Sequence, residues 1–371
     1  MGRLVYFCAG VSSSHRPLVP IEGILVNAVN QGKTPATLNR CRAMMDEVKP
    51  KFRITDSGGF QLALILEKYE ACKRHNDHNG MRKQFVTVEK FIEKNTPVDV
   101  IKRAGKFDSD IVMGLDLPIL NYSDHNSRWR EFNGKFPVNL TWANKSIECW
   151  KKQSSGSQLM LPLQCYNYDQ LMIFLRGLYF DDFSGVALPT RNHTAGELAE
   201  MIRVISKQGI RRIHILGSSS LLVIAMMAFL TRNYLEWGSI DSSTWLMAAN
   251  YRRYIDPITL RQVDLSKMVI PSAYCGCDFC KRWYNTFDAP RDFACGLATH
   301  NYLAIDGAVK RMHQVSTSVE SLKGHLLAAF PKKADRDKIK ELVISLERFK
   351  IRPTSKMKES EPEIKNRKIL T

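Results

Sequence analysis

The sequence lacks the features of a membrane protein or a secreted protein. No apolar run approaches the roughly 18 residues of a membrane-spanning helix, which excludes a helical membrane protein. The first ten residues hold one arginine and a short apolar run, which is too short for a secretory signal. The nine cysteines are odd in number and argue against a disulfide framework. We therefore expect a cytoplasmic protein with no membrane partner, whose cysteines are buried or bind metal.

Acidic residues are scarce relative to basic ones. The 371 residues include 54 Lys and Arg against 37 Asp and Glu, a formal net charge of +17. This excess favours a nucleic acid as partner, because each phosphate that a basic side chain neutralises releases counterions. The basic residues are spread along the chain, however, so the charge alone fits a solubilising surface equally well.

Short apolar runs bounded by Gly, Asp or Asn recur along the chain. Continuous apolar strands of this kind are buried on both faces, as in parallel sheets. Helical patterns lie between them, such as 194–208, which opens with a Thr cap and a Glu three residues later, and 220–235. Eight alternations predict an α/β fold, a (β/α)8 TIM-type barrel rather than an open doubly wound sheet. The eight candidate strands are 4–10, 23–30, 52–58, 110–116, 159–164, 183–189, 212–218 and 237–243.

Polar residues or glycine close the C-terminal ends of five of these runs. Barrel active sites are built on that face, from the ends of several strands. Equivalent positions on five runs therefore predict one shared pocket. The five residues are Asp56, Asp116, Gln164, Gly217 and Asp241.

A cysteine cluster, CGCDFC at 275–280, predicts a metal site. Three thiolates at this spacing converge on one ion from a tight turn, and a fourth ligand completes a tetrahedral site. Either Cys295 or His300 fits as that ligand. Four protein ligands make a closed site, so we expect a structural Zn2+.

These features predict three regions. Residues 1–255 form the catalytic barrel, and 256–330 form a zinc-binding subdomain packed on it. Residues 331–371 form a basic C-terminal region, with a helix at 334–350 and a charged tail that we expect to be disordered.

The segment TDSGGFQ at 55–61 follows the third run. Its two glycines let the backbone approach a flat ligand, Asp56 and Ser57 offer hydrogen-bonding groups, and Phe60 offers a stacking face. Taken alone, the segment equally fits an ordinary strand-to-loop turn.

The segment SIDSSTW at 239–245 supplies a second carboxylate at a strand end. Two carboxylates facing one pocket suit displacement at a sugar carbon, where one attacks C1′ and the other moves the proton of the leaving group. Taken alone, Asp241 equally fits a helix N-cap.

In this order, the motifs resemble the tRNA-guanine transglycosylase superfamily over residues 4 to 305. The resemblance lies in TDSGGFQ, an Asp closing VMGLD, a Gln closing LPLQ, an Asp near the eighth strand end, then C-x-C-x-x-C and a distal His-Asn. It implies that Asp241 is the nucleophile, which bonds covalently to C1′ after guanine leaves. It also implies that Asp56 is the acid/base group, with Ser57 and Gly58 beside it and Phe60 stacking on the purine.

The resemblance also implies how the base and the metal are bound. Asp116 would accept hydrogen bonds from the N1–H and 2-amino group of guanine, since an ionised carboxylate only accepts. Gln164 would meet O6, and Gly217 would line the pocket. Because Asn301 follows His300 as in the family, the resemblance favours His300 as fourth ligand. The implied zinc ligands are Cys275, Cys277, Cys280 and His300.

Two departures from the family pattern narrow the expected substrate. The glycine pair after the sixth strand is here Leu188-Pro189, and the nucleophile lies in SIDSSTW rather than in a Phe-Asp-Cys context. The altered surroundings resemble the DNA-guanine transglycosylases (DpdA type), which insert 7-deazaguanine bases such as 7-cyano-7-deazaguanine into DNA. The expected partners are then DNA and a free 7-deazaguanine base. An ATPase partner protein is a further possibility that the sequence does not decide.

Three alternatives remain from the sequence. The same base exchange on tRNA keeps the chemistry and changes the polymer. A non-catalytic paralogue that binds nucleic acid need not keep both Asp56 and Asp241, although both are present here. A zinc-stabilised barrel acting on an unrelated small molecule leaves the basic excess without a role.

Overall fold

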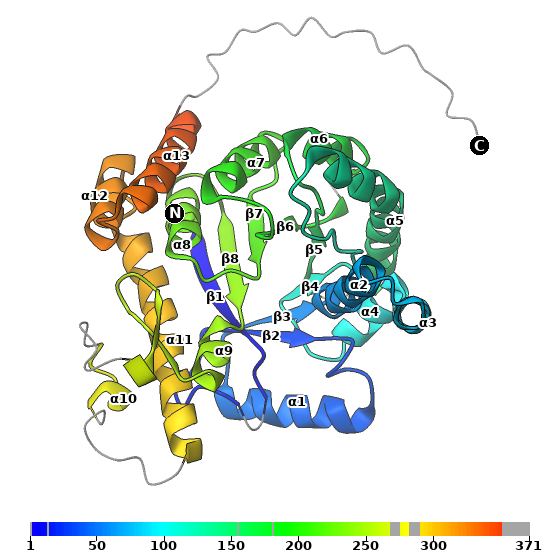
Figure 1. The fold of residues 1–371 in the computed structure, drawn as a ribbon, viewed down its shortest axis with the longest axis horizontal. Coiled ribbons are helices and arrows are strands. Elements are labelled where there is room, and N and C mark those ends of the chain that lie inside the picture. Colours follow the sequence, from blue (N-terminus) through cyan, green and yellow to red (C-terminus); the bar gives the residue numbers. More distant parts are fainter. Residues whose placement is uncertain are drawn as a thin grey trace, which may run out of the picture.

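A computed structural model describes residues 2–12, 15–153, 156–179, 182–267, 275–281 and 290–350 (Figure 1). Eight parallel strands form a closed barrel, because the first strand pairs with both the second and the eighth. The predicted (β/α)8 barrel is therefore confirmed. The strands are β1 (Arg3–Ala9), β2 (Gly23–Asn27), β3 (Phe52–Asp56), β4 (Ile111–Met113), β5 (Gln158–Pro162), β6 (Gly185–Pro189), β7 (Arg212–Leu216) and β8 (Trp237–Ser242).

Helices follow the strands and surround the barrel (Figure 1). Up to the eighth strand they are α1 (Pro35–Val48), α2 (Gly59–Arg74), α3 (His78–Lys94), α4 (Pro97–Ala104), α5 (His125–Lys152), α6 (Tyr168–Arg176), α7 (Ala195–Lys207) and α8 (Leu221–Asn233). The predicted capping box of α7 is present, since Thr194 accepts from the backbone of Glu197 and the Glu197 side chain accepts from the backbone of Thr194. The patterns predicted at 194–208 and 220–235 thus form α7 and α8.

The β4 strand is shorter than the predicted run at 110–116. After Met113 the chain leaves the ladder and becomes a loop that Asn139 of α5 holds. The Asn139 side chain accepts from Leu117 N–H at 2.7 Å and donates to Leu117 C=O at 3.0 Å. This side chain replaces the strand partner that the backbone would otherwise need.

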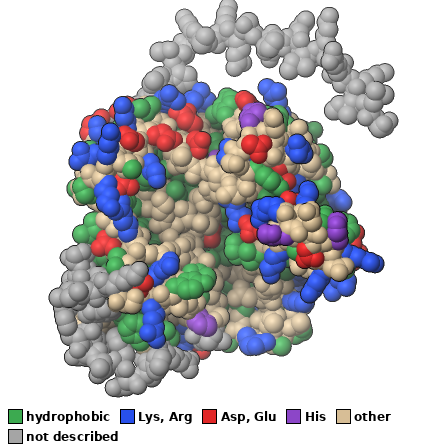
Figure 2. Space-filling model, viewed as in Figure 1, with side chains coloured by type: hydrophobic (Ala, Val, Ile, Leu, Met, Phe, Trp, Pro, Cys, Tyr) green, Lys and Arg blue, Asp and Glu red, His purple; other side chains and the backbone are tan. Residues whose placement is uncertain are grey.

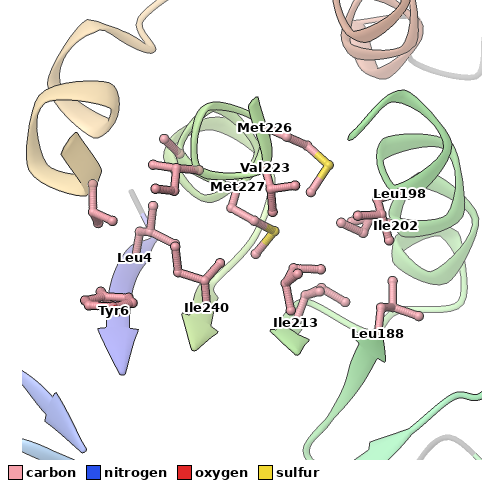
Figure 3. Close-up of a cluster of buried hydrophobic side chains, with 14 of the residues drawn as sticks. Leu4, Tyr6, Leu188, Leu198, Ile202, Ile213, Val223, Met226, Met227 and Ile240 are labelled. Carbon is pink, nitrogen blue, oxygen red and sulfur yellow. The ribbon is translucent and has the colours of Figure 1, made fainter. Parts of the chain in front are cut away.

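Alternate residues of each strand face opposite sides of the barrel wall. On β1, Val5 and Phe7 pack inside the barrel, whereas Leu4 and Tyr6 pack outside it. The outer layer joins β1, β6, β7 and β8 to α7 and α8 (Figure 3). Both faces of the wall are therefore apolar, which is why the strands appear as continuous apolar runs in the sequence.

The helices α2 and α3 pair with each other beside the barrel (Figure 1). No residue of α3 is fully buried, and the buried residues of α2 all lie near its start, at Gly59, Leu62 and Ala63. The pair therefore forms a helical hairpin, 59–94, that projects from the C-terminal end of β3.

The rest of the described chain packs against β1 and α8, chiefly through α11, and against α7 through α13. It consists of α9 (Thr244–Asn250), β9 (Arg253–Ile255), β10 (Gln262–Asp264), the 3-10 turn η2 (Leu265–Lys267), α10 (Asp278–Lys281), α11 (Pro290–Val315), α12 (Val319–Ala329) and α13 (Lys333–Lys350). The last of these is the helix predicted at 334–350, whereas the tail from 351 lies outside the described residues. The division at 255 and 330 stays a prediction. None of the helices in the described ranges has both the length and the hydrophobicity that a membrane span requires.

Candidate functional site

A cavity of about 550 Å³ opens at the C-terminal ends of the barrel strands. In the space-filling view this face of the molecule is hollowed near its centre (Figure 2). Two further predicted residues, Ser57 and Gly58, lie beside the cavity without lining it. Six of the predicted residues line it: Asp56, Phe60, Asp116, Gln164, Gly217 and Asp241.

Asp241 lies at the end of β8 and is held by one of its two carboxylate oxygens. Its Oδ1 accepts hydrogen bonds from His214 Nε2 at 3.0 Å and from Gly217 N–H at 3.0 Å. No described residue donates to Oδ2. The side chain is 90% buried, yet it lines the cavity. One oxygen of Asp241 is thus available to a ligand.

Asp56 lies at the end of β3, which β1 and β2 separate from the β8 strand of Asp241. Its Oδ2 accepts from Asn27 Nδ2 at 2.9 Å and from Gly58 N–H at 3.2 Å. Burial, and then the charge of Asp241, raise the pKa of Asp56 to about 6, against the lowering effect of these two hydrogen bonds. A carboxyl group with this pKa can give up and take back a proton near neutral pH.

Asp116 follows β4, and its pKa is also raised. Burial, and then the charge of Asp56, raise the pKa of Asp116 to about 7. Its Oδ2 accepts from Gln164 Nε2 at 2.5 Å and its Oδ1 from Ser57 Oγ at 3.2 Å. These bonds orient the carboxylate and leave lone pairs on both oxygens for a ligand.

The loop after β4 forms a fixed wall of the cavity. Lys135 donates to Pro118 C=O at 2.7 Å, and Gln164 Oε1 accepts from Ile119 N–H at 3.2 Å. Pro118 and Ile119 line the cavity between Asp116 and Gln164. The Gln164 amide therefore ties the wall to the carboxylate and keeps one N–H for a ligand.

The start of α2 needs glycine. Gly58 has φ +92, and a Cβ there would lie 2.6 Å from Val29 Cγ2, so another residue would be strained and would clash. The turn places Phe60 at the cavity, where 59% of it is exposed. An exposed aromatic ring at the rim of a polar cavity offers a stacking face.

Leu188 and Pro189, which stand where the family pattern has two glycines, lie in different surroundings from each other. Leu188 is fully buried in the outer core, so it belongs to the barrel wall. Pro189 lines the cavity together with Thr190 and Arg191, and Arg191 pairs with Glu67 of α2. Without an N–H, Pro189 cannot donate a hydrogen bond from this wall.

Two residues that hold the carboxylates, Asn27 and His214, were not among those predicted from the sequence. Asn27 ends β2 directly beside Asp56 in the strand register, so its position at a run end was the available signal. His214 is fully buried inside β7 and pairs in register with Ser239. One histidine in an apolar run gives no indication of its partner, which lies 27 residues later at Asp241.

The predicted metal ligands Cys275, Cys277, Cys280 and His300 lie together. Their ligand atoms are all within 4.8 Å of one another. His300 Nδ1 lies 3.1 Å from Cys275 Sγ, 3.4 Å from Cys277 Sγ and 3.3 Å from Cys280 Sγ. Cys295, the alternative ligand, is not part of this group. The cluster is arranged as a metal-binding site, with the protein filling four positions.

The surroundings of His300 prepare its ring for a metal. Its Nε2 lies 3.0 Å from Ile255 C=O, which can only accept, so Nε2 holds the proton and Nδ1 is left as a ligand. Tyr254 stacks on the ring at 4.0 Å. Asn301 accepts from Ile255 N–H at 2.9 Å and donates to Arg253 C=O at 3.0 Å. The cluster therefore joins α10 and α11 to β9.

No protein-family model matches the chain, and no curated protein matches it.

Proposed function

We propose that the protein exchanges guanine in DNA for a 7-deazaguanine base, such as 7-cyano-7-deazaguanine, through a covalent bond between Asp241 and deoxyribose. One observation supports this most directly. A single cavity at the barrel mouth holds three carboxylates, of which Asp241 presents a free oxygen and Asp56 has a pKa of about 6. A nucleophile and a proton carrier on one cavity are what displacement at a sugar carbon needs.

The first step releases guanine. Asp241 Oδ2 forms a bond to C1′ while the C1′–N9 bond breaks and its electron pair goes to the base. Protonated Asp56 gives its proton to the leaving guanine and becomes a carboxylate. The free Oδ2 of Asp241 and the raised pKa of Asp56 fit these two roles.

The second step reverses the roles with a different base. The Asp56 carboxylate takes the proton from the ring nitrogen of the incoming 7-deazaguanine, and that nitrogen forms the new bond to C1′. The C1′–Oδ2 bond breaks, and its electron pair returns to Asp241. The enzyme regains its starting protonation, so the exchange needs no further reactant.

Asp116 and Gln164 are suited to recognise the base. The ionised carboxylate of Asp116 accepts from adjacent N1–H and 2-amino donors, and the remaining N–H of Gln164 faces O6. Phe60 stacks on the ring. Adenine offers no such pair of donors at that edge, so these contacts favour guanine.

The tip of the α2–α3 hairpin supports a polyanionic substrate. All of its basic side chains are exposed, and within the described residues only Lys73 has a carboxylate as near as 4.0 Å, that of Glu70. Lys, Arg and His side chains gather there (Figure 2). Since α2 begins at the cavity and ends at these side chains, we propose that they contact phosphates of the same nucleic acid about 20 Å from a flipped-out nucleotide. They are Lys73, Arg74, His75, His78, Arg82 and Lys83.

The Cys3His donor set fits Zn2+, for which three thiolates and an imidazole are common ligands. When bound, the ion would supply a cross-link and no chemistry to the reaction. Cys275, Cys277, Cys280 and His300 would hold it, and α10 would be fixed against α11 and β9.

The proposal is tested by incubating the enzyme with radiolabelled guanine and either duplex DNA or tRNA. We expect label to enter DNA with the wild type and not with Asp241→Asn. Label entering only tRNA would mean that the same base exchange acts on tRNA and not on DNA. Label entering neither, with a folded enzyme, would contradict the proposed activity and favour a non-catalytic paralogue. Mass spectrometry of nucleosides from cells with and without the gene identifies the inserted base.

A further inference from the structure

His214 links the inside of the barrel to Asp241. It lies on β7, is fully buried, and does not line the cavity. Its Nδ1 is 2.6 Å from Ser239 Oγ and its Nε2 is 3.0 Å from Asp241 Oδ1. Ser239 and Asp241 are two residues apart on β8, so both project into the barrel. The three side chains form a line that ends at the cavity.

We propose that His214 is a positioning residue that fixes Asp241 so that Oδ2 is the attacking atom; this inference rests on the proposed function. A carboxylate oxygen only accepts, so the proton of the 3.0 Å contact belongs to His214 Nε2. In the neutral ring Nδ1 is then the acceptor, and the Ser239 hydroxyl donates the second hydrogen bond.

The two donors to Asp241 act on the same oxygen. His214 Nε2 and Gly217 N–H both donate to Oδ1, each at 3.0 Å. Turning the carboxylate about its Cβ–Cγ bond would break both hydrogen bonds. The interaction therefore selects one orientation, with Oδ2 toward the cavity, before any substrate binds.

The same contacts serve the second step. In the covalent intermediate Oδ1 is the carbonyl oxygen of the ester and still accepts from His214 and Gly217. When the C1′–Oδ2 bond breaks, negative charge returns to the carboxylate and is shared with Oδ1. A donor already in place stabilises that charge without reorganisation. His214 is thus expected to act on both steps while touching neither the base nor the sugar.

The kinetic test compares His214→Phe, which removes the donor, with His214→Gln, which keeps an N–H. We expect His214→Phe to lower kcat about 100-fold and to leave KM for DNA near its wild-type value, since misplacement rather than binding is affected. His214→Gln should recover part of the loss, and Ser239→Ala should have a smaller effect. Thermal unfolding of each variant measures any loss of folding. A folded His214→Phe with wild-type kcat would overturn the proposal.

A second measurement does not depend on activity. Nitrogen-15 NMR of His214 should show a protonated Nε2 and an unprotonated Nδ1, and Asp241→Ala should shift the Nε2 signal. An unchanged Nε2 signal would overturn the contact itself. If this signal behaves as expected but the wild type exchanges no base in any nucleic acid, the proposed function fails, and the positioning role with it.

Discussion

The barrel-mouth cavity and the Cys3His cluster both bring together ionisable side chains from distant parts of the chain. The two sites differ in the partners that these side chains have. In the cluster, four ligand atoms face one another within 4.8 Å, and the ring of His300 is held by Ile255. In the cavity, three carboxylates share one space, and the pKa values of Asp56 and Asp116 are raised by burial and by a neighbouring carboxylate. The ligand atoms of the cluster face one another as in a closed metal site, whereas the cavity leaves carboxylate oxygens open to a ligand.

The largest effect is expected from changing Asp56, the proposed proton carrier of the cavity. Asp56→Asn keeps the shape of the side chain and its place beside Asn27, but it cannot transfer a proton at neutral pH. We expect the rate of guanine exchange to fall about 10²- to 10⁴-fold. Steady-state kinetics with labelled guanine measures the loss. Exchange at the wild-type rate would show that Asp56 is not the acid/base group.

The metal-binding role of the Cys3His cluster is tested by removing one of its ligands. Cys275→Ser should lose its bound zinc and lower the free energy of unfolding by about 3 kcal/mol or more, because metal binding is coupled to folding. Cys295→Ser is the matched control, since Cys295 lies outside the ligand group. Elemental analysis and thermal unfolding measure both effects. Equal zinc content in the two variants would contradict the assigned ligand set.

Substitutions at the hairpin tip test whether the protein binds a polyanionic substrate there. Changing Arg82 and Lys83 to Gln together should weaken duplex DNA binding and reduce the slope of log K against log salt by about 2, if each side chain neutralises one phosphate. Lys338→Gln with Lys340→Gln is the matched control, because these exposed residues lie on α13, far from the hairpin (Figure 1). Fluorescence anisotropy at several salt concentrations measures the slopes. Equal slopes would remove the hairpin from the DNA interface.

The raised pKa of Asp116 predicts a modest pH dependence of base binding. Only the ionised carboxylate accepts from N1–H and the 2-amino group, and the ionised fraction increases through a pKa of about 7. Affinity for free guanine should therefore increase about tenfold between about pH 6 and about pH 8. Calorimetry across this range measures it, with Asp116→Asn as the variant in which the dependence disappears. Affinity that falls with pH would contradict the role of Asp116.

The barrel strands, the three cavity aspartates and the cysteine cluster could be predicted from the sequence, because each depends on a local pattern. Strands buried on both faces appear as apolar runs, and Asp56, Asp116 and Asp241 ended such runs. The spacing of the cysteines predicted their convergence. The His214 contact depends instead on the register between β7 and β8, which no local pattern shows. The α2–α3 hairpin was also missed, because the apolar face of α3 predicts a helix but does not show which element that face packs against.

The most direct test of the central claim is to trap the covalent intermediate. The enzyme is incubated with guanine-containing duplex DNA, quenched, and run on a denaturing gel. We expect a protein–DNA adduct with the wild type, and mass spectrometry of its peptides should place the bond on Asp241. The adduct should be absent with Asp241→Asn. An adduct that persists in Asp241→Asn would contradict the claim that this aspartate is the nucleophile.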